Sequence, residues 1–292
     1  MRVRSSDGAC TSRSKYARAT VKTNAERARG RTWDLTFIPN TRRKMSRRQK
    51  ENYRELFDAH GIRFDARPRT MRGSGDDGST SDEASRMKRY ETLDWDRAFP
   101  GGGGGGGEPR RRVLELGCGL GDNLIAAAIE FETYVFLGVE VHRPGVATAL
   151  GEIEARGLTN AKVCEMDALW LMTGEYVEDA SIDECLVHFP DPWRDESGLD
   201  RKAHRRIVNE TLLTSLERTL RPGTGRLSVA TDDDQYARHL ERVFEQFARP
   251  RGWVRCDPFA RFDSKYASRA LEEGRSCVDV GFRFHPPSVD VA

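Results

Sequence analysis

A carboxylate and three closely spaced glycines stand where an apolar segment ends. Glu115 is followed by Gly117, Gly119 and Gly121, directly after the apolar run 112–114. Glycines at a turn from strand to helix let backbone N–H groups approach a nucleotide-type cofactor. A carboxylate at that point opposes phosphate, and Gly-x-Gly-x-Gly is not the Gly-x-Gly-x-x-Gly spacing of dinucleotide sites. The loop therefore indicates a nucleotide-type ligand that carries positive charge.

Two further acids end the next two expected strands. Glu140 closes the segment 133–139, at the spacing of an acid that accepts hydrogen bonds from ribose hydroxyls. Asp167 follows the segment 161–165 and is placed to receive an adenine amino group. Ribose, adenine and positive charge together describe S-adenosylmethionine, which has a sulfonium and an ammonium group. The alternative is a tight glycine turn with Glu115 and the other acids solvated in loops.

The fourth expected strand runs into Phe189-Pro-Asp-Pro-Trp193. Two prolines restrict the backbone around Asp191, so that its carboxylate and the Trp193 indole project beside the cofactor. The alternative is a rigid turn with Trp193 packed on the core. The run 200–206 adds a basic cluster at the expected start of a helix, where the dipole disfavours positive charge. A phosphate partner would explain the cluster, whereas the ordinary interpretation is a solvated helix face.

Expected strands and helices alternate in a way that brings these loops together. The alternation predicts the α/β class, with a doubly wound, mostly parallel seven-stranded sheet. Ligands of such sheets bind at the carboxyl ends of the strands, where the strand order reverses. The expected strands are 112–116, 133–139, 161–165, 181–189 and 226–230, the expected helices are 122–131, 144–156, 202–220 and 233–247, and strands 253–257 and 277–284 form an antiparallel edge pair.

Charge is distributed unevenly along the 292 residues. The first fifty residues carry 15 basic and 3 acidic side chains, a net +12, so that the remainder nets −10 against +2 overall. Residues 1–32 are rich in Arg, Ser and Thr, hold two acids and lack an apolar core, which is typical of a chloroplast or mitochondrial transit peptide. The alternatives are an RNA-binding basic arm or a disordered leader, with the protein in the cytoplasm.

Two segments without an apolar face divide the chain, at 66–88 and in the glycine run 101–107. We therefore expect a leader over 1–32, a basic extension with disordered insertions over 33–107, and the catalytic domain over 108–286. No segment is predicted to span a membrane. The six cysteines are scattered and predict neither a metal site nor disulfides.

The motifs together resemble those of the bacterial-type tRNA (guanine-N7)-methyltransferases. The combination of Gly-Val-Glu-Val-His with Phe-Pro-Asp-Pro-Trp is far more specific than a glycine loop. The resemblance implies a class I S-adenosylmethionine-dependent methyltransferase fold, and methyl transfer to N7 of guanine 46 in the tRNA variable loop. The matching segments, in the family's order and approximate spacing between residues 110 and 284, are Leu114-Glu-Leu-Gly-Cys-Gly119, Phe136-Leu-Gly-Val-Glu-Val-His-Arg-Pro-Gly-Val146, Asp167-Ala168, Phe189-Pro-Asp-Pro-Trp193 and Ala230-Thr-Asp232.

The resemblance also implies roles by position. It places Asp191 at the active site, as the catalytic residue, and Asp232 against the substrate. Asp232 by itself also has the position of a helix N-cap. The candidate cofactor contacts are Glu115, Gly117, Gly119, Glu140, Asp167 and Asp191, and the candidate tRNA contacts are Trp193, Arg194, Lys202, Arg205, Arg206, Asp232, Ser264, Lys265 and Tyr266.

Two departures from the family pattern concern the substrate. The stretch 195–200 separates Trp193 from the basic residues, which leaves Arg194 and Lys202 as candidates for the family's substrate lysine. The family's Thr-Lys-Phe-Glu is replaced by Ser264-Lys-Tyr-Ala267, which keeps the hydroxyl, amine and ring and loses the carboxylate. If that acid contacts guanine or the cofactor, the activity is weakened or the target shifted.

Guanine N7 has an in-plane lone pair, so methyl transfer needs alignment of the reacting atoms rather than removal of a proton. We expect Asp191 to hold the Watson–Crick edge of the guanine through its N–H donors, and Trp193 to shape the pocket and stack on the base. Arg205, Arg206 and the segment 42–50 are candidates for phosphate contacts.

Two other functions fit parts of the pattern. An NAD-dependent oxidoreductase would share the strand–loop–helix unit, but the glycine spacing and Glu115 disfavour it. A non-catalytic tRNA-binding scaffold on the same fold is motivated by Ala267 and the inserted acidic stretch, and the intact Asp191 speaks against it.

Overall fold

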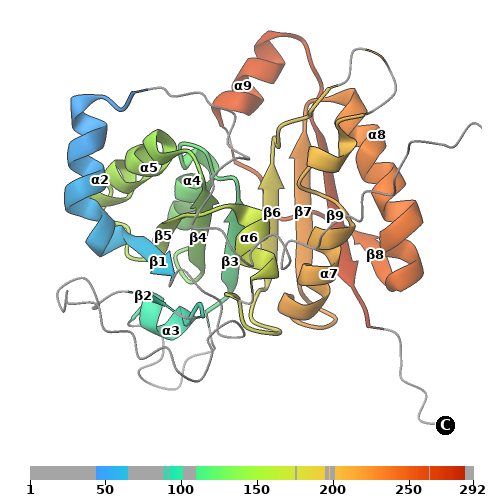
Figure 1. Cartoon of the computed structure of the whole chain (residues 1–292), viewed down its shortest axis with the longest axis horizontal. Helices are drawn as coiled ribbons and strands as arrows, with labels where there is room; N and C mark the ends of the chain where they lie inside the picture. The colour runs from blue at the N-terminus through green and yellow to red at the C-terminus, as the bar shows by residue number, and fades with distance from the viewer. Residues whose placement is uncertain are drawn as a thin grey trace, which may run out of the picture. The chain divides into compact units, whose positions relative to one another are not determined.

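A mostly parallel sheet of nine strands runs through the part of the chain that the computed structural model describes, residues 44–64, 89–90, 92–100, 110–174, 176–194, 197, 201–262 and 264–286 (Figure 1). The leader expected over 1–32 lies outside these residues. The strands are β1 (Gly61–Phe64), β2 (Arg89–Tyr90), β3 (Arg112–Leu116), β4 (Val135–Glu140), β5 (Ala161–Glu165), β6 (Glu184–His188), β7 (Arg226–Thr231), β8 (Trp253–Cys256) and β9 (Val278–Phe284).

Seven of these strands confirm the predicted doubly wound sheet. Their order is β5-β4-β3-β6-β7-β9-β8, and β9 runs antiparallel to both of its neighbours. Strands β4 and β5 lie on one side of β3, and β6 and β7 lie on its other side. The strand order therefore reverses between β3 and β6, and the loops after these two strands flank that point. Strands β1 and β2 extend the sheet beyond β5, and β1 pairs in parallel with β5. Strands β1 and β2 both belong to the segment 33–107, which the sequence analysis described as a basic extension.

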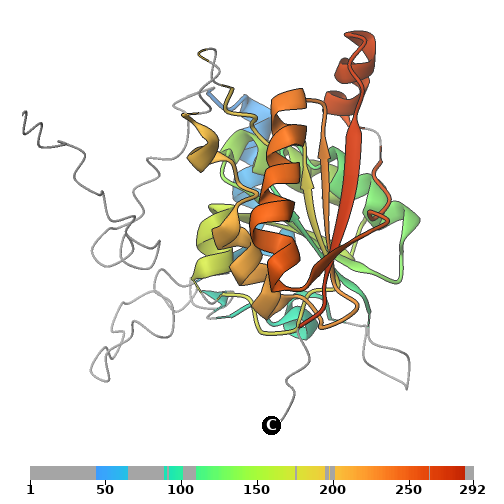
Figure 2. The same ribbon diagram turned by 90° about the vertical axis from the view of Figure 1, so that its right-hand side faces the viewer.

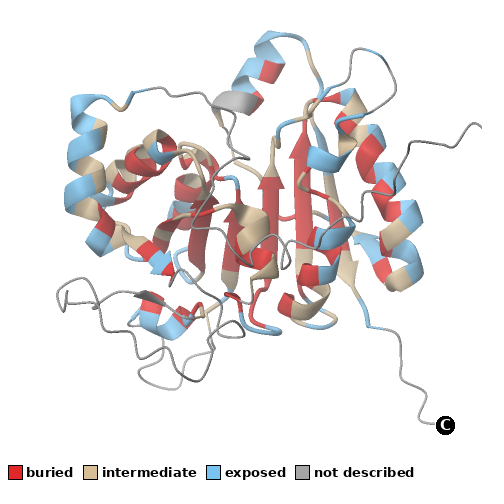
Figure 3. Cartoon of the chain, viewed as in Figure 1, coloured by how far each residue is buried: buried red, intermediate tan, exposed pale blue. Residues whose placement is uncertain are grey.

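Helices cover both faces of the sheet (Figures 1 and 2). One face packs against α2 (Arg47–His60), α4 (Asp122–Glu130) and α5 (Arg143–Ala155), and the other packs against α3 (Trp95–Ala98), α6 (Ala168–Thr173), α7 (Glu210–Thr219) and α8 (Asp234–Val243). Strand β4 is buried along almost its whole length, as expected for a parallel strand covered on both faces. Figure 3 shows the same concentration of buried residues in the central strands.

The segment before residue 108 contributes helix α2 to this packing. Ser46 caps the helix through a reciprocal pair of hydrogen bonds with Gln49, whose side-chain amide also donates to the Thr148 hydroxyl of α5 at 3.1 Å. Asn52 donates to the Ala147 carbonyl at 3.2 Å, and Phe57 is buried under the helix. Residues 44–64 are therefore part of the folded core and not a separate arm. None of the described helices combines the length and apolar character needed to cross a membrane.

The helix expected over 202–220 is wrong in its first half. A single 3-10 turn, η3 (Ala203–Arg205), is followed by extended backbone, and α7 begins only at Glu210. Asn209 caps α7 by accepting a hydrogen bond from the Leu212 N–H at 3.0 Å. The basic cluster therefore lies on a turn, and the argument from the helix dipole does not apply to it.

The helix expected over 233–247 begins as predicted and ends early. Asp233, not Asp232, is the N-cap of α8, and it accepts a hydrogen bond from the Tyr236 N–H at 2.8 Å. After Val243 the backbone widens into a π turn, η4 (Phe244–Ala248), and a 3-10 turn, η5 (Arg249–Arg251), leads into β8. The remaining helix, α9 (Lys265–Glu272), projects beyond the carboxyl ends of β6 and β7 (Figures 1 and 2).

Candidate active site at the carboxyl edge of the sheet

Five acids named from the sequence lie at the carboxyl ends of five adjacent strands. Glu115 lies near the end of β3, Glu140 ends β4, Asp167 follows β5, Asp191 follows β6 and Asp232 follows β7. These strands are parallel neighbours in the order β5-β4-β3-β6-β7, so their ends meet at one edge. The fold therefore gathers residues that are far apart in the sequence.

The loop after β3 needs glycine for its backbone conformation. Gly117 has a φ of +79° and Gly119 a φ of +60°, in the left-handed region that other residues avoid. A Cβ placed on either residue would meet no heavy atom within 4 Å, so the space beside the loop is open. Helix α4 begins at Asp122, directly after this loop, and the first N–H groups of a helix have no acceptor within it.

Glu140 closes over the glycine loop from the neighbouring strand. Its carboxylate accepts hydrogen bonds from the Gly119 N–H at 2.9 Å and the His142 N–H at 2.7 Å. Burial raises the pKa of Glu140, and these backbone hydrogen bonds oppose the rise. Because carboxylate oxygens accept more than one hydrogen bond each, the group can still take hydroxyl donors.

Glu115 is buried, so the alternative of a solvated acid is wrong for this residue. Its side chain is 3% exposed, and its Oε1 lies 3.6 Å from Nδ1 of His188, whose side chain is 6% exposed. Among the described residues, Oε2 of Glu115 has no hydrogen-bond partner. A buried carboxylate without a donor at a strand end is typical of a binding site.

Asp167 has a structural role that the sequence did not indicate. It is the N-cap of α6, and its Oδ1 accepts a hydrogen bond from the Trp170 N–H at 2.8 Å. Burial raises the pKa of Asp167. The cap fixes the carboxylate at the edge of the site, where its remaining lone pairs suit an amino donor.

The loop after β6 is strained at both ends. Phe189 has a φ of +47° and Trp193 a φ of +46°. Such left-handed backbone angles are energetically unfavourable for any residue that has a Cβ atom. The Phe189 N–H donates to the Ala230 carbonyl at 2.8 Å, which ties the start of the loop to β7. Asp191, between the two prolines, is exposed. Strain held around an exposed acid points to a functional loop rather than a plain turn.

Three arginines contact this loop or its surroundings. Arg205 places its guanidinium carbon 4.5 Å from the centre of the Trp193 ring, on which it stacks. Arg194 pairs with Asp233, the N-cap of α8. The Trp193 ring is thus held between the loop and an exposed arginine, and it is not part of the core as the rigid-turn alternative required.

Arg206 has a different role from the one expected of it. Its side chain is fully buried, and its Nε donates to the Pro192 carbonyl at 2.8 Å. The guanidinium carbon also lies 5.8 Å from the ring centre of Tyr236, in α8. A buried guanidinium cannot meet an RNA phosphate in this conformation. Arg206 therefore anchors the Asp191 loop from beneath, and the expectation of a phosphate contact is corrected.

The residues expected to hold the substrate at α9 lie on the same edge. Ser264 is the N-cap of α9, accepting a hydrogen bond from the Ala267 N–H at 3.2 Å. Lys265 begins that helix, and Tyr266 follows it; their side chains are outside the described part of the structure. Asp232 does not cap a helix and forms an ion pair with Arg275, which leads into β9.

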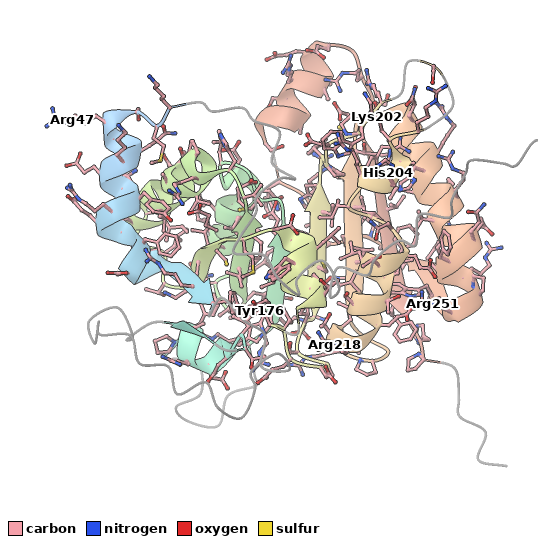
Figure 4. The ribbon with its side chains drawn as sticks, in the orientation of Figure 1. Arg47, Tyr176, Lys202, His204, Arg218 and Arg251 are labelled. Atoms are coloured by element: carbon pink, nitrogen blue, oxygen red, sulfur yellow. The ribbon has the colours of Figure 1, made fainter. Side chains whose placement is uncertain are left out.

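Basic side chains line the same side of the molecule. Lys202 and His204, at the η3 turn, are exposed near the carboxyl ends of the strands (Figure 4). Arg47, at the start of α2, lies on that side as well, whereas Arg218 and Arg251 lie toward the opposite edge of the sheet (Figure 4). The segment 42–50 is described only from residue 44. Exposed cations therefore flank the candidate site.

Sequence reasoning missed two buried groups of the site. His188 stands directly before Phe189, the last residue of the expected strand 181–189, and this position near the strand end was the one available signal. Asn123, in the first turn of α4, is 4% exposed and accepts a hydrogen bond from the Phe262 N–H at 2.9 Å. Neither residue belongs to a spacing that is recognisable without the fold.

Several known proteins resemble this chain. Residues 109–278 match the family model described as a putative methyltransferase. A tRNA (guanine-N(7)-)-methyltransferase of Alkalilimnicola ehrlichii is 35% identical over 201 residues, which cover 66% of this chain and 78% of that protein. The protein of the same name from Alcanivorax borkumensis is 38% identical over 178 residues, covering 59% of this chain and 71% of that protein. The solved 16S rRNA methyltransferase KamB, at 16% identity, covers 60% of this chain and 88% of its own with a TM-score of 0.44.

Proposed function

This chain belongs to the bacterial-type tRNA (guanine-N7)-methyltransferase family, and we propose that it transfers a methyl group from S-adenosylmethionine to N7 of guanine 46 in the variable loop of tRNA. The observation that carries the proposal is the strained Phe189–Trp193 loop, which presents Asp191 beside the glycine loop at the point where the strand order reverses. The assignment to position 46 rests on the sequence resemblance.

The polar groups of the site fit the proposed cofactor. Open space beside Gly117 and Gly119 leaves room for a ligand against the backbone. Glu140 would accept hydrogen bonds from ribose hydroxyls, and Asp167 would accept one from the adenine amino group. The buried charge of Glu115 suits a cationic ligand and disfavours a pyrophosphate, which also argues against the NAD-dependent alternative.

When bound, S-adenosylmethionine supplies a methyl group as the bond from N7 to carbon forms, the carbon–sulfur bond breaks with its electron pair left on sulfur, and the positive charge passes to the base. No proton leaves N7, so the work of the protein is orientation. Well-oriented reactants gain about 7–11 kcal/mol over a bimolecular encounter. The residues of the site therefore act chiefly by position.

We assign orientation of the guanine to the loop after β6. The exposed Asp191 carboxylate would accept hydrogen bonds from the N–H donors on the Watson–Crick edge of the base. The Trp193 ring, stacked on one side by Arg205, offers the base a flat apolar wall. Arg206 holds the carbonyl of Pro192, between these two residues, and so fixes their relative position.

Exposed cations at the same edge would contact the tRNA backbone. Lys202 and Arg205 lie at the η3 turn, and Arg47 lies at the start of α2 on the same side as Lys202 (Figure 4). Phosphate contacts of this kind release counterions, so binding should weaken steeply as salt rises. A salt-independent affinity for tRNA, measured by filter binding, would count against this surface.

The direct test is methyl transfer to unmodified tRNA. The full chain is incubated with tRNA transcript and methyl-labelled S-adenosylmethionine, and the RNA is digested to identify the labelled nucleoside. We expect label in 7-methylguanosine that is lost with Asp191→Ala and with a transcript carrying adenine at position 46. Label in 7-methylguanosine with the altered transcript would refute position 46 as the target and would leave guanine N7 methylation as the reaction. Binding of both ligands without transfer would instead favour the tRNA-binding scaffold.

We also propose that residues 1–32 act as a transit peptide for a chloroplast or mitochondrion, on the basis of their Arg- and Ser/Thr-rich composition. One fusion joins residues 1–32 to a fluorescent protein, and a second joins the whole chain to it. We expect both fusions to be imported into an organelle. An even cytoplasmic signal from the fusion of residues 1–32 would overturn the proposal.

A further inference from the structure

An arginine outside the sequence motifs lies against the first residue of the Asp191 loop. The guanidinium carbon of Arg261 is 5.5 Å from the centre of the Phe189 ring, within the range of a cation–π contact. Phe189 is half-buried, and its φ of +47° makes it one of the two strained residues of the loop. Arg261 therefore covers the strained start of the loop, whereas Arg206 holds the other end at Pro192.

Arg261 is itself fixed by an acid of strand β9. Its Nε donates to Oδ1 of Asp279 at 2.7 Å, and its Nη2 donates to Oδ2 at 3.1 Å, so the two planar groups meet through two hydrogen bonds. The side chains of Arg261 and Asp279 are 21% and 33% exposed, so solvent screens the pair only in part. A two-pronged pair of this kind fixes the orientation of the guanidinium as well as its position.

The strand pairing places Asp279 beside the backbone that holds the loop. Asp279 is the register partner of Ala230 across β7 and β9. The carbonyl of Ala230 accepts the hydrogen bond from the Phe189 N–H at 2.8 Å. The N–H of Phe189 is thus tied to β7 directly, and its ring is tied to the adjacent residue of β9 through Arg261. Strained backbone persists only where its surroundings fix it, and these contacts surround Phe189 from two strands.

The segment that carries Arg261 has a fixed path across the sheet. The Phe259 N–H donates to Oγ of Ser228 in β7 at 2.8 Å, and the Phe262 N–H donates to Oδ1 of Asn123 in α4 at 2.9 Å. Arg261 lies between these two hydrogen bonds, and the N-cap of α9 follows it by three residues. Arg261 therefore connects the loop after β6 with the start of α9, the two elements that carry candidate substrate contacts.

We propose that Arg261, held by Asp279, is a positioning residue for methyl transfer: it fixes the Phe189 end of the loop and thereby places Asp191 against the guanine. The inference rests on the proposed function. Arg261 acts through the Phe189 ring and not by contact with the reacting atoms. The alternative is an ion pair that only stabilises the edge of the sheet, and the two roles differ in their effect on turnover.

The first test removes the guanidinium and keeps the apolar stem, in Arg261→Met. We expect kcat at saturating tRNA and S-adenosylmethionine to fall about 10- to 100-fold, because a displacement of about 1 Å can cost about 100-fold in rate. The affinity for S-adenosylhomocysteine, measured by calorimetry on the full chain, should stay within about twofold. Arg261→Lys keeps the charge without the two-pronged geometry, so it should recover only part of kcat.

The second test asks whether the arginine and the acid act as one unit. Asp279→Asn alone should lower kcat about 3- to 10-fold, because the amide keeps one acceptor for the guanidinium and loses the charge. Added to Arg261→Met, the same change should alter kcat by less than about twofold. Losses that multiply in the double variant would show two independent roles and would overturn the inference.

Arg255 offers a matched control with the same kinds of contact. It pairs with Glu241, and its guanidinium carbon lies 4.4 Å from the centre of the Phe244 ring. It also lies 5.8 Å from the ring centre of Phe282, which points to the opposite face of β9 from Asp279. Arg255→Met should therefore lower the Tm as an ion-pair loss does, and leave kcat within about twofold.

Hydrogen exchange of the loop gives a readout that does not depend on activity. Arg261→Met should speed exchange of the Phe189 N–H at least about threefold, the factor that an exposed cation–π contact contributes, and Arg255→Met should not change it. If either kcat or the exchange rate is unchanged in folded Arg261→Met, or if Arg255→Met lowers kcat as much, the inference is overturned.

Two further outcomes are decided in advance. If Arg261→Met does not fold, as judged by circular dichroism, the loss of kcat and the faster exchange must be found with Arg261→Lys and Asp279→Asn, and their absence there would overturn the inference. If the unaltered chain does not methylate tRNA, the proposed function is contradicted. The exchange measurement then decides by itself whether Arg261 holds the loop, so the two failures are distinguishable.

Discussion

Arg206 offers the sharpest test of how the site is held together. Arg206→Met keeps most of the apolar stem and removes the guanidinium, whose Nε donates to the Pro192 carbonyl at 2.8 Å inside the protein. A hydrogen bond to a charged group contributes about 1.5–3 kcal/mol, so we expect the free energy of unfolding to fall by about 2 kcal/mol. For a domain of this size that corresponds to a fall in Tm of about 4–8 °C.

The larger effect should be on turnover. Pro192 lies between Asp191 and Trp193, in a loop strained at Phe189 and Trp193, and the strain persists only while the surroundings hold it. Loss of the anchor lets the loop relax, and a displacement of about 1 Å at a reacting group can cost about 100-fold in rate. We expect kcat to fall about 10- to 100-fold at saturating ligands, with S-adenosylhomocysteine affinity within about twofold of the unaltered protein.

The neighbouring arginine is the matched control. Arg205 is exposed and stacks on Trp193, so Arg205→Met should lower stability by about 1 kcal/mol or less and act mainly on the KM for tRNA. Thermal melts and steady-state kinetics on both variants separate the two roles. If Arg206→Met lowers the Tm and leaves kcat unchanged at a temperature where it is folded, the argument that Arg206 positions Asp191 is refuted.

Four other outcomes follow from the site. Asp191→Asn should reduce kcat far more than cofactor affinity, and the opposite pattern in binding titrations would refute its role as a guanine anchor. Ala267→Glu restores the acid of the family motif and should raise the methylation rate several-fold; an unchanged rate would show that the lost carboxylate is not needed. Gly119→Ala and Gly157→Ala impose the same backbone strain, at φ of +60° and +61°, and each should lower the free energy of unfolding by about 1–2 kcal/mol. Only Gly119→Ala places a methyl group in the cofactor space, so only this variant should weaken S-adenosylhomocysteine binding in calorimetry. Because burial raises the pKa of Glu140, cofactor affinity should begin to fall on acidification at a higher pH than an ordinary glutamate predicts, and a pH titration of Glu140→Gln should lack that component.

The parts of the fold that the sequence predicted correctly are those determined by neighbouring residues. Buried parallel strands are short apolar runs, and glycines and acids follow them directly, so β3, β4 and β5 were placed within a residue or two. The helix over 202–220 failed for the opposite reason. The backbone between η3 and α7 is extended where Arg206 turns inward to reach Pro192, a contact that no local pattern specifies.

The segment 33–107 likewise has some features that depend on neighbouring residues and others that depend on distant contacts. Its basic charge was evident, but the pairing of β1 with β5 and the packing of α2 on α5 depend on partners about a hundred residues away. Hydrophobic periodicity identifies an element and does not name the surface on which it packs.

The sequence by itself determined the kind of chemistry, since the order of glycines, acids and Phe-Pro-Asp-Pro-Trp specifies which groups stand at strand ends and which family shares them. Only the tertiary structure decided how those groups are used. Parallel strands bring Glu115 and His188 within 3.6 Å of each other, bury Arg206 beneath Pro192 and leave Arg205 exposed beside it. Burial and distance arise when distant segments pack, and they are what separate two adjacent arginines into an anchor and a surface cation.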